Sequence, residues 1–284
     1  MNRPAMPVKR VLVVIPTLDE ARHIEAVLSD LTRDLPRDAA VQVAVVDGGS
    51  TDGTVDIVRR LQARMFALTL LHNPQRRQAP GINLAVRTLG AEADVLVRCD
   101  AHAVYPPGYV ARLLATLDRT GADAVVVPMD SVGTTGLQRV IGWVSDTRIG
   151  SGGAAHRGGR RSGWVDHGHH AAFRLDSFRR AGGYDESFTH NEDAELDCRQ
   201  RALGSRIYLD ADIRLAYAPR ASLDRLARQY FLYGRGRSRT VRRHPGSLRL
   251  RQLAVPLHMA ACGFALLAAP WAPELLAWPG WQPG

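Results

Sequence analysis

The stretch VLVRCDAHAVY, residues 95–105, is where the predicted strands and helices of this chain converge. Apolar and semi-apolar residues lead into Asp100-Ala101-His102, a pattern typical of a buried strand that ends in polar side chains. Side chains alternate along a strand, so Asp100 and His102 are expected to point the same way. Divalent cations accept carboxylate oxygen, and Mn²⁺ also accepts imidazole. The pair is therefore a candidate metal site for a diphosphate, with a turn cap beside a packed histidine as the alternative.

Three strand–helix units precede this stretch. Each has an apolar run of strand length, a polar loop and a run with helical periodicity. The strands are expected over residues 8–16, 41–46 and 68–72, and the helices over residues 21–35, 55–64 and 82–89. Strands that alternate with helices predict an α/β fold with a mostly parallel sheet flanked by helices.

Two loops at the ends of these strands carry candidate binding residues. The loop from Asp47 to Thr54 is rich in glycine, and the carboxyl end of a parallel strand is where such sheets bind ligands. It lacks the GxGxxG pattern and the P-loop lysine, but Asp47 could accept hydrogen bonds from a base or a ribose. A plain turn with a helix cap is the alternative, and it explains Asp52 and Thr54 better. Arg76, in the loop over residues 73–81, is a candidate partner for phosphate or a solvated surface residue.

The middle of the chain has a predicted strand over residues 124–128 and a segment rich in Gly, Arg and Ser over residues 145–163. We expect that segment to be a loop, either near an acceptor or inert on the surface. Residues 164–173 contain three histidines and Asp166, but no cysteine partners and no helical i, i+4 pair, which disfavours a zinc site. We expect a strand over these residues instead, which, by resemblance to the family named below, would support the sugar and acceptor pocket.

Asn191-Glu192-Asp193 opens a predicted helix over residues 194–203. Carboxylates at a helix N-terminus are stabilised by the helix dipole, so a simple cap explains them. A group transfer that needs a general base to take a proton from a hydroxyl is the functional alternative.

Five segments, in this order and spacing, together resemble the family 2 inverting glycosyltransferases with a GT-A fold, and in particular the succinoglycan-type glucosyltransferases of bacterial exopolysaccharide assembly. The resemblance covers roughly residues 8–245. It implies a Rossmann-like domain that transfers a sugar from a nucleotide donor with inversion. The segments are VVIPTLDEARHI, VAVVDGGSTDGT, NPQRRQAPGINLAV, VRCDAHAVYPPGYV and HNEDAELDCRQR.

The resemblance also implies roles on the donor side. The motif after the first strand would line the nucleoside pocket, and Asp47 would recognise the uracil. The segment with Arg76 and Asn83 would run past the ribose and diphosphate. Asp100 and His102 match the family's Asp-x-Asp metal motif, with histidine in place of the second acid, so Mn²⁺ or Mg²⁺ is the expected cofactor. The nucleoside-pocket residues are Pro16, Thr17 and Glu20.

On the acceptor side, Asp193 matches the family's catalytic aspartate, and Glu192 matches its neighbour that helps to order the acceptor site. The segment from Tyr233 to Arg239 lies where processive relatives have Gln-x-x-Arg-Trp, but it lacks the tryptophan and that spacing. The position suggests a lid that brings Arg235 and Arg237 to the diphosphate, and the mismatch argues against a processive synthase. A solvated basic surface is the alternative.

The charge of the chain limits the classes of binding partner that it suits. The 284 residues carry a net charge of +9, with 37 basic and 28 acidic side chains, which suits nucleic acid, an anionic membrane or a phosphate-bearing substrate. Position favours the membrane, because the densest basic stretch directly precedes an apolar C-terminal segment, and we expect no nucleic acid partner. Its arginines are at positions 225, 228, 235, 237, 239, 242, 243, 249 and 251.

The C-terminal segment LAVPLHMAACGFALLAA, residues 253–269, is apolar over 17 residues, near the lower limit for crossing a bilayer. It is expected to embed in or lie on a membrane, helped by Trp271, Trp278 and Trp281, or else to pack on the domain. Three scattered cysteines and the lack of an N-terminal apolar signal favour the cytoplasmic face of a bacterial inner membrane. The expected divisions are a GT-A domain over 1–220, a basic helix and lid over 221–251, and a membrane-associating tail over 252–284.

The expected function is metal-dependent transfer of a sugar, with glucose as the resemblance's first choice, from a UDP-sugar to a lipid-linked saccharide. Two alternatives belong to other classes. One is a nucleotidyltransferase that makes the nucleotide sugar, which would normally have a Gly-rich loop with a lysine near the first strand. The other is a non-catalytic protein that binds membranes through its arginines.

Overall fold

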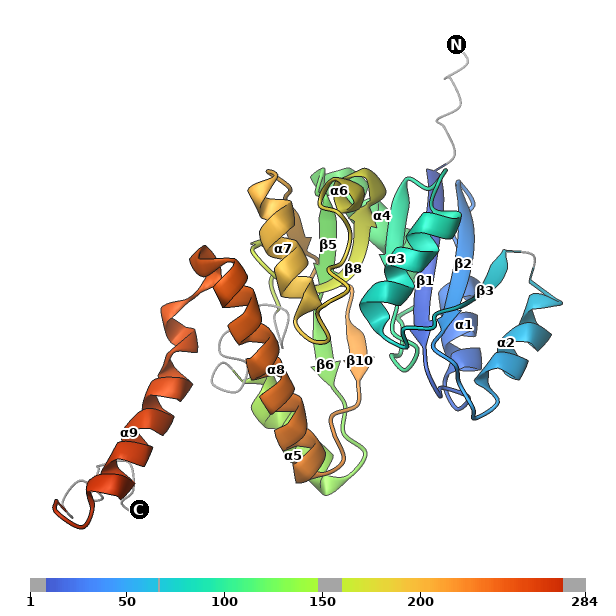
Figure 1. Ribbon diagram of the computed structural model, residues 1–284. Helices are drawn as coiled ribbons and strands as arrows, with labels where there is room; N and C mark the ends of the chain where they lie inside the picture. Colours follow the sequence, from blue (N-terminus) through green and yellow to red (C-terminus); the bar gives the residue numbers. More distant parts are fainter. Residues whose placement is uncertain (1–8, 66, 148–159, 273–284) are drawn as a thin grey trace. The chain divides into compact units, whose positions relative to one another are not determined.

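The computed structural model describes residues 9–65, 67–147 and 160–272, and the chain divides into two compact units between Arg243 and His244. The first unit holds an eight-stranded sheet with the order β3-β2-β1-β4-β8-β5-β9-β7 (Figure 1). Its strands are β1 (Lys9–Thr17), β2 (Ala39–Asp47), β3 (Leu68–His72), β4 (Val95–Arg98), β5 (Ala124–Val127), β7 (Gly163–Val165), β8 (His169–Arg174) and β9 (Ile207–Leu209).

The sheet is mixed and mostly parallel, as the sequence predicts. Strands β1 to β4 pair in parallel, and so do β5 and β9. Strand β8 lies antiparallel between β4 and β5, and β7 is antiparallel to β9. The carboxyl ends of β1, β2, β3 and β4 therefore meet at one edge of the sheet. Strands β2 and β3 lie on one side of β1, and β4 lies on the other, so the chain changes direction across the sheet at β1.

Helices cover both faces of the sheet. Val13 and Ile15 of β1 pack with α1, α2 and α4 on one face, while Leu12 and Val14 pack with α3, α6 and α7 on the other. This period-two division of one strand explains why β1 is apolar from Val11 to Pro16. The helices are α1 (Ile24–Arg33), α2 (Thr54–Gln62), α3 (Gln78–Leu89), α4 (Tyr109–Thr120), α6 (Leu175–Arg180) and α7 (Glu192–Ala202).

Two boundaries near the site differ from the sequence prediction. Strand β4 ends at Arg98, so Asp100 and His102 lie in the turn that follows and not on the strand. Helix α3 begins at Gln78, four residues earlier than predicted, because proline is tolerated in the first turn of a helix and Pro80 does not delay it.

Helix α8 (Leu223–Arg243) includes the segment after Tyr233 that was predicted as a lid, and the role of a lid stays a prediction. The helix continues through Gly234 and Gly236. Gly236 is buried where α8 meets the backbone of His190, and a Cβ there would lie 2.6 Å from the His190 carbonyl oxygen. The glycine thus permits a close approach between two segments and does not end the helix.

Some elements have no counterpart in the sequence prediction. Helix α5 (Gly136–Asp146) starts with a capping box formed by Thr135 and Gln138. Strands β6 (Met129–Ser131) and β10 (Leu215–Tyr217) form a separate two-stranded parallel sheet. Each of these strands has three residues, too few for a period to be recognised.

The second unit contains two short 3₁₀ turns, Pro245–Ser247 and Leu250–Gln252, and helix α9 (Ala254–Ala268). Across the described residues, no helix combines the length and the apolarity needed to cross a bilayer. Trp278 and Trp281 lie outside the described residues, as does most of the Gly-, Arg- and Ser-rich segment, residues 148–159.

Candidate functional site

A hollow of about 180 Å³ opens at the carboxyl ends of β1 to β4. The turn after β1, the loop after β2, the start of α3 and the turn after β4 all contribute to its wall. The topology explains the position, because the ends of adjacent parallel strands leave a crevice at this edge. Six of the residues predicted to bind donor or metal line it: Pro16, Thr17, Glu20, Arg76, Asp100 and His102.

The loops around this hollow hold one another in place. Ser50 Oγ accepts a hydrogen bond from the Asp19 backbone N–H at 2.8 Å, and Asp19 Oδ1 accepts one from the Thr51 N–H at 2.8 Å. Asp19 and Arg76 both have positive φ, 54° and 57°, which is uncommon for residues other than glycine. The backbone beside the hollow is therefore held in strained conformations by its surroundings, as is common at binding sites.

Asp47 is not among the residues that line the hollow. Its carboxylate is 4% exposed and accepts hydrogen bonds from the Gly49 and Ser50 backbone N–H groups at 2.8 and 3.0 Å. The neighbours of Asp47, Val46 and Gly48, reach the wall of the hollow. The observed contacts are those of a loop cap, and uracil recognition by Asp47 stays a prediction.

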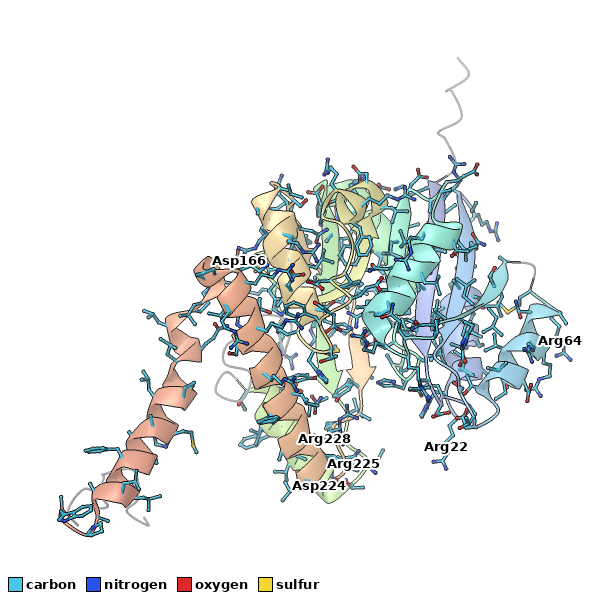
Figure 2. The ribbon with its side chains drawn as sticks, in the orientation of Figure 1. Arg22, Arg64, Asp166, Asp224, Arg225 and Arg228 are labelled. Atoms are coloured by element: carbon cyan, nitrogen blue, oxygen red, sulfur yellow. The ribbon has the colours of Figure 1, made fainter. Side chains whose placement is uncertain are left out.

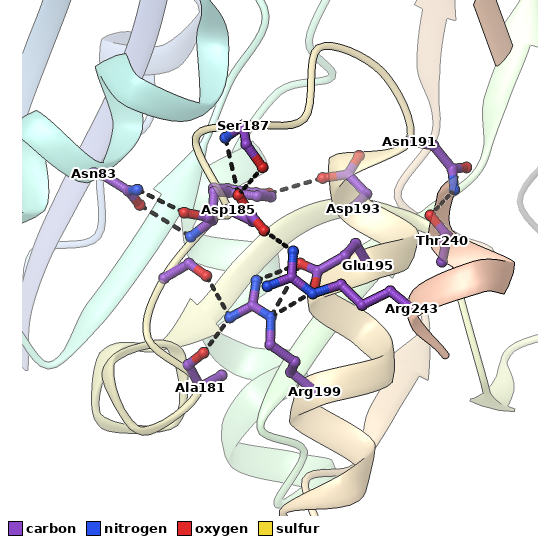
Figure 3. A network of polar contacts seen from close by, with 12 residues as sticks. Asn83, Ala181, Asp185, Ser187, Asn191, Asp193, Glu195, Arg199, Thr240 and Arg243 are labelled. Carbon is purple, nitrogen blue, oxygen red and sulfur yellow. Dashed lines mark hydrogen bonds and ion pairs between the residues drawn. The ribbon is translucent and has the colours of Figure 1, made fainter. Parts of the chain in front are cut away.

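Asn83 also lies away from the hollow. Its side chain donates to the Tyr184 carbonyl oxygen at 2.8 Å and accepts from the Tyr184 N–H at 3.0 Å (Figure 3). It also donates to Glu186 Oε1 at 3.0 Å. Asn83 thus fastens α3 to the segment before α7. Its contacts fix Tyr184 and do not face the donor residues.

The predicted metal pair lies at the wall of the hollow within a polar cluster. His102 Nδ1 is 2.9 Å from Glu20 Oε1, and this hydrogen bond raises the pKa of His102. Asp100 Oδ1 accepts from Gln78 at 2.9 Å, and Asp100 Oδ2 is 3.5 Å from His169 Nε2. Burial alone would raise the pKa of Asp100, but Arg98 and His169 outweigh it and the pKa lies below its usual range.

These donors suit a divalent cation in chemistry, since Asp100 offers carboxylate oxygen and His102 and His169 offer imidazole nitrogen. Among the described residues, no three acidic, histidine or cysteine side chains are already arranged around one point as a metal cage. Asp100 would therefore have to share its carboxylate between Arg98 and a cation.

Asp193 lies across from Asp100, joined to it by a buried arginine. Arg98 is 6% exposed, and its Nη1 donates to both carboxylate oxygens of Asp193 at 3.0 and 2.8 Å. Arg98 Nη2 donates to Asp100 Oδ1 at 3.3 Å. Tyr184 donates its hydroxyl to Asp193 Oδ1 at 2.8 Å (Figure 3). The structure thus brings the predicted base and the predicted metal ligand to one guanidinium.

The electrostatics of this cluster keep Arg98 charged and keep Tyr184 and Glu192 more readily protonated than usual. Burial opposes the charge of Arg98, but Asp193 and Asp100 raise the pKa of its guanidinium well above the usual range. Burial and the charge of Asp193 likewise raise the pKa of Tyr184, which therefore remains a donor. Burial and Asp193 raise the pKa of Glu192 to about 7.

The N-terminus of α7, which carries Glu192 and Asp193, is fastened by α8. Asn191 has φ of 66° and donates its side-chain N–H to Thr240 Oγ1 at 2.7 Å (Figure 3). Arg239 donates to the Ser187 carbonyl oxygen at 2.7 Å, and Arg243 pairs with Asp185. The exposed Arg235 and the half-buried Arg237 do not line the hollow: Arg235 lies near His190 and Arg237 near Cys198.

The histidines of residues 164–173 diverge. His167 Nδ1 is 2.5 Å from Asp197 Oδ2, Asp166 pairs with Arg201, and His169 lies near Asp100. His167 and His169 therefore have different partners in the part of the chain that the structure describes.

Two residues of this cluster, Arg98 and Tyr184, were not predicted from the sequence to belong to the site. A signal for Arg98 was present, because an arginine inside a buried strand requires acidic partners. Tyr184 carried no such signal, since a buried tyrosine is common in cores and its partner is distant in the fold.

Comparisons with known proteins identify the family of the chain. The family model described as "Glycosyl transferase family 2" matches residues 12–182. The succinoglycan biosynthesis protein ExoA of Rhizobium meliloti (strain 1021) is 46% identical over 259 residues, which cover 91% of this chain and 78% of that protein.

Solved structures share the fold. A mannosyltransferase, PcManGT, from Pyrobaculum calidifontis in complex with GDP-Man and Mn²⁺ superposes with a TM-score of 0.65 at 26% identity, over 95% of this chain and 80% of that chain. TarS residues 1–349 of S. aureus in complex with UDP superposes with a TM-score of 0.55 at 17% identity, over 74% and 60%. The chain belongs to glycosyl transferase family 2 and is a glycosyltransferase with the GT-A fold.

Proposed function

We propose that this glycosyltransferase moves a sugar from a UDP-sugar, with inversion, to a hydroxyl group of a lipid-linked saccharide during bacterial exopolysaccharide biosynthesis. The 46% identity to a succinoglycan biosynthesis protein supports the pathway class. Glucose is the proposed sugar on the resemblance to succinoglycan-type glucosyltransferases.

One observation carries the proposal. The hollow at the strand ends and the N-terminus of α7 are joined through Arg98, which contacts Asp100 at 3.3 Å and Asp193 at 2.8 Å. A direct displacement needs the donor's anomeric carbon between a leaving diphosphate and an acceptor hydroxyl with its base. We assign Asp100 to the side of the leaving diphosphate and Asp193 to the side of the acceptor, and Arg98 contacts both.

On the donor side, we assign the nucleoside to the wall formed by Pro16, Thr17 and Glu20, with Asp47 toward the base. Arg76, at the same wall, carries a positive charge that complements a phosphate. Asn83 would act indirectly by holding the segment of Tyr184, and Arg235 and Arg237 could reach a diphosphate only if α8 moved.

A divalent cation, Mn²⁺ or Mg²⁺, would be held by Asp100 and His102, with His169 close enough to Asp100 to contribute. When bound, such a cation offsets the negative charge that develops on the departing diphosphate. The imidazole donors favour Mn²⁺ over Mg²⁺.

On the acceptor side, Asp193 is the proposed base and Glu192 its neighbour in the acceptor site. Arg98 and Tyr184 hold the Asp193 carboxylate, which fixes where it can receive the acceptor proton. With a pKa near 7, Glu192 can hold a proton at neutral pH and so donate a hydrogen bond to a saccharide hydroxyl.

A lipid-linked acceptor requires access to a membrane, and we propose attachment at the cytoplasmic face of the inner membrane. Arg225 and Arg228 are exposed on the first turns of α8 (Figure 2), where they can meet anionic headgroups. Within the second unit, α9 exposes large apolar side chains: Leu257, Met259, Phe264, Leu266 and Leu267.

The test is turnover with a panel of sugar nucleotides and a lipid-linked saccharide fraction extracted from an exopolysaccharide-producing bacterium. UDP-glucose with Mn²⁺ should release UDP and label the lipid fraction with a linkage inverted relative to the donor. Transfer from GDP-mannose alone would contradict the proposed donor, and that outcome is the specific alternative, because the similar mannosyltransferase structure holds GDP-Man.

A further inference from the structure

Arg98 occupies a place where burial of charge is costly. It ends β4, the strand between β1 and β8, and the three residues before it, Val95, Leu96 and Val97, are apolar and at most 1% exposed. Its own side chain is 6% exposed. Its Nε has no hydrogen-bond partner among the described residues. A guanidinium in such surroundings loses hydration that its contacts only partly replace.

Stability alone does not explain this residue. Buried ion clusters are often no more stable than well-packed apolar residues of the same volume, because desolvation offsets the attraction. What a buried cluster does provide is a defined orientation of its members. In this cluster those members are Asp193, the proposed base, and Asp100, the proposed cation ligand.

The shape of the contact explains why arginine stands there. One nitrogen, Nη1, meets both oxygens of Asp193, while the other, Nη2, meets Asp100. A lysine has a single nitrogen and could not hold two carboxylates in one plane. Tyr184, itself fixed by Asn83, approaches Asp193 Oδ1 from another element. The orientation of Asp193 is therefore set from β4 and from the segment before α7 together.

Resting on the proposed function, we propose that Arg98 is a positioning residue of the transfer reaction: it holds the Asp193 carboxylate toward the acceptor and ties that position to Asp100 on the donor side. Arg98 touches neither substrate in this arrangement and acts through the two carboxylates. Its loss leaves Asp193 present but misdirected, and a displacement of about 1 Å in a reacting group can cost about 10²-fold in rate.

The kinetic test compares Arg98→Met and Arg98→Lys with wild type, measuring UDP release from UDP-glucose with Mn²⁺ and the lipid-linked saccharide extract. Both variants should lower kcat about 10²-fold with little change in the KM for UDP-glucose. In an Asp193→Asn background, Arg98→Met should cause no further loss of kcat, because the two residues act as one unit. If Arg98→Met lowers kcat by the same factor in wild type and in Asp193→Asn, the proposal is overturned.

A matched control separates positioning from folding. Arg174 ends β8, beside β4, and donates to the backbone carbonyl oxygens of Ala122 and Leu117. Arg174→Met should lower the thermal unfolding temperature and leave kcat unchanged. If Arg174→Met lowers kcat as much as Arg98→Met does, the loss of kcat in Arg98→Met reflects general destabilisation, and the proposal is overturned.

The link between Arg98 and Asp193 can also be measured without substrate. If wild type releases no UDP from any UDP-sugar, the proposed function fails, and unfolding by urea then decides the link. Arg98→Met leaves the half-buried Asp193 without its cation, so adding Asp193→Asn should recover part of the lost stability. Strictly additive losses would show that the two side chains are not coupled and would overturn the inference.

Discussion

Asp193 carries the proton-transfer step of the proposed reaction. Asn in its place keeps the size and an oxygen that faces Arg98, but it removes the proton affinity of the carboxylate. Asp193→Asn should therefore lower transfer about 10²–10⁴-fold, the usual contribution of a general base. Calorimetric affinity for UDP with Mn²⁺ should be unchanged, because the hollow does not include this residue.

The matched control is Asp176→Asn on α6, an exposed acid whose nearest cation is Arg180 at 3.9 Å. This variant should keep full turnover. If Asp193→Asn keeps full turnover as well, another group takes the acceptor proton.

Glu192 predicts a pH dependence of stability. Its pKa is about 7 in the folded protein, against 4.5 for an ordinary glutamate, because burial and Asp193 disfavour its charge. Between these pH values the folded protein holds a proton that the unfolded chain has released. The free energy of unfolding should therefore fall as pH rises from about 4.5 to 7.

Urea unfolding of Glu192→Gln checks this dependence, because glutamine does not titrate. Relative to wild type, the variant should gain more stability at pH 8 than at pH 4.5. A constant difference between the two proteins across this range would mean that the pKa of Glu192 is not raised.

Single residues of the site were predictable where a motif carried them. Asp100, His102, Glu20 and Arg76 were expected at one donor site from their order in the chain, and all four line the hollow. Tyr184 was not predictable as a partner of Asp193, because their contact depends on how Asn83 holds the intervening turn. No local pattern encodes such a contact.

At the level of elements, the packing of α8 on the segment before α7 holds the N-terminus of α7, which carries the proposed base. Gly236 allows this packing, since a Cβ there would lie 2.6 Å from the His190 carbonyl oxygen and 2.9 Å from Asn191 Cβ. Gly236→Ala should cost about 1–3 kcal/mol of unfolding free energy, the usual cost of overpacking. It should also lower kcat, because Asn191 adjoins Glu192 and Asp193.

Gly234→Ala, on the same helix, is the matched control. Nothing lies within 4 Å of a Cβ at Gly234. Alanine there should stabilise the protein by about 0.5–1 kcal/mol, as expected inside a helix. Equal effects of both substitutions in chemical denaturation would show that α8 is not packed closely on residues 190–191.

The strand and helix pattern of the first half was predictable because each unit is apolar, then polar, then helical. The lid was predicted from the position of a motif in related enzymes, and that position did not reveal that residues 233–239 belong to one helix, in which Gly236 serves close packing. The antiparallel insertion of β8 between β4 and β5 could not be read from the sequence either, since the apolar period of a strand is the same in both directions.

At the level of the whole molecule, we predict binding to anionic vesicles. Phe264→Glu and Leu267→Glu place charges on exposed apolar positions of α9 and should weaken co-flotation with vesicles that contain phosphatidylglycerol. Leu203→Glu, at an exposed position just after α7, should have no effect. Membrane attachment through the basic and apolar segments would be contradicted if vesicle binding changed neither with the α9 substitutions nor with the charge of the lipid.

The expected divisions at residues 220 and 251 stay predictions. The arginine-rich composition predicted a basic segment from residue 221 onward. Composition does not reveal that α8 contacts the residues before α7, through Thr240 to Asn191 and through Arg243 to Asp185. The fold class was predictable from order and period, whereas contacts between distant elements required the structure.

The central claim is a metal-dependent UDP site at the strand ends, and calorimetric titration of UDP and then GDP into the full chain, with and without Mn²⁺, tests it most directly. We predict that UDP binds with Mn²⁺ and only weakly without it, that GDP binds poorly, and that Asp100→Ala abolishes the metal effect. UDP binding that is indifferent to Mn²⁺ and to Asp100→Ala, or tighter binding of GDP, would contradict the account.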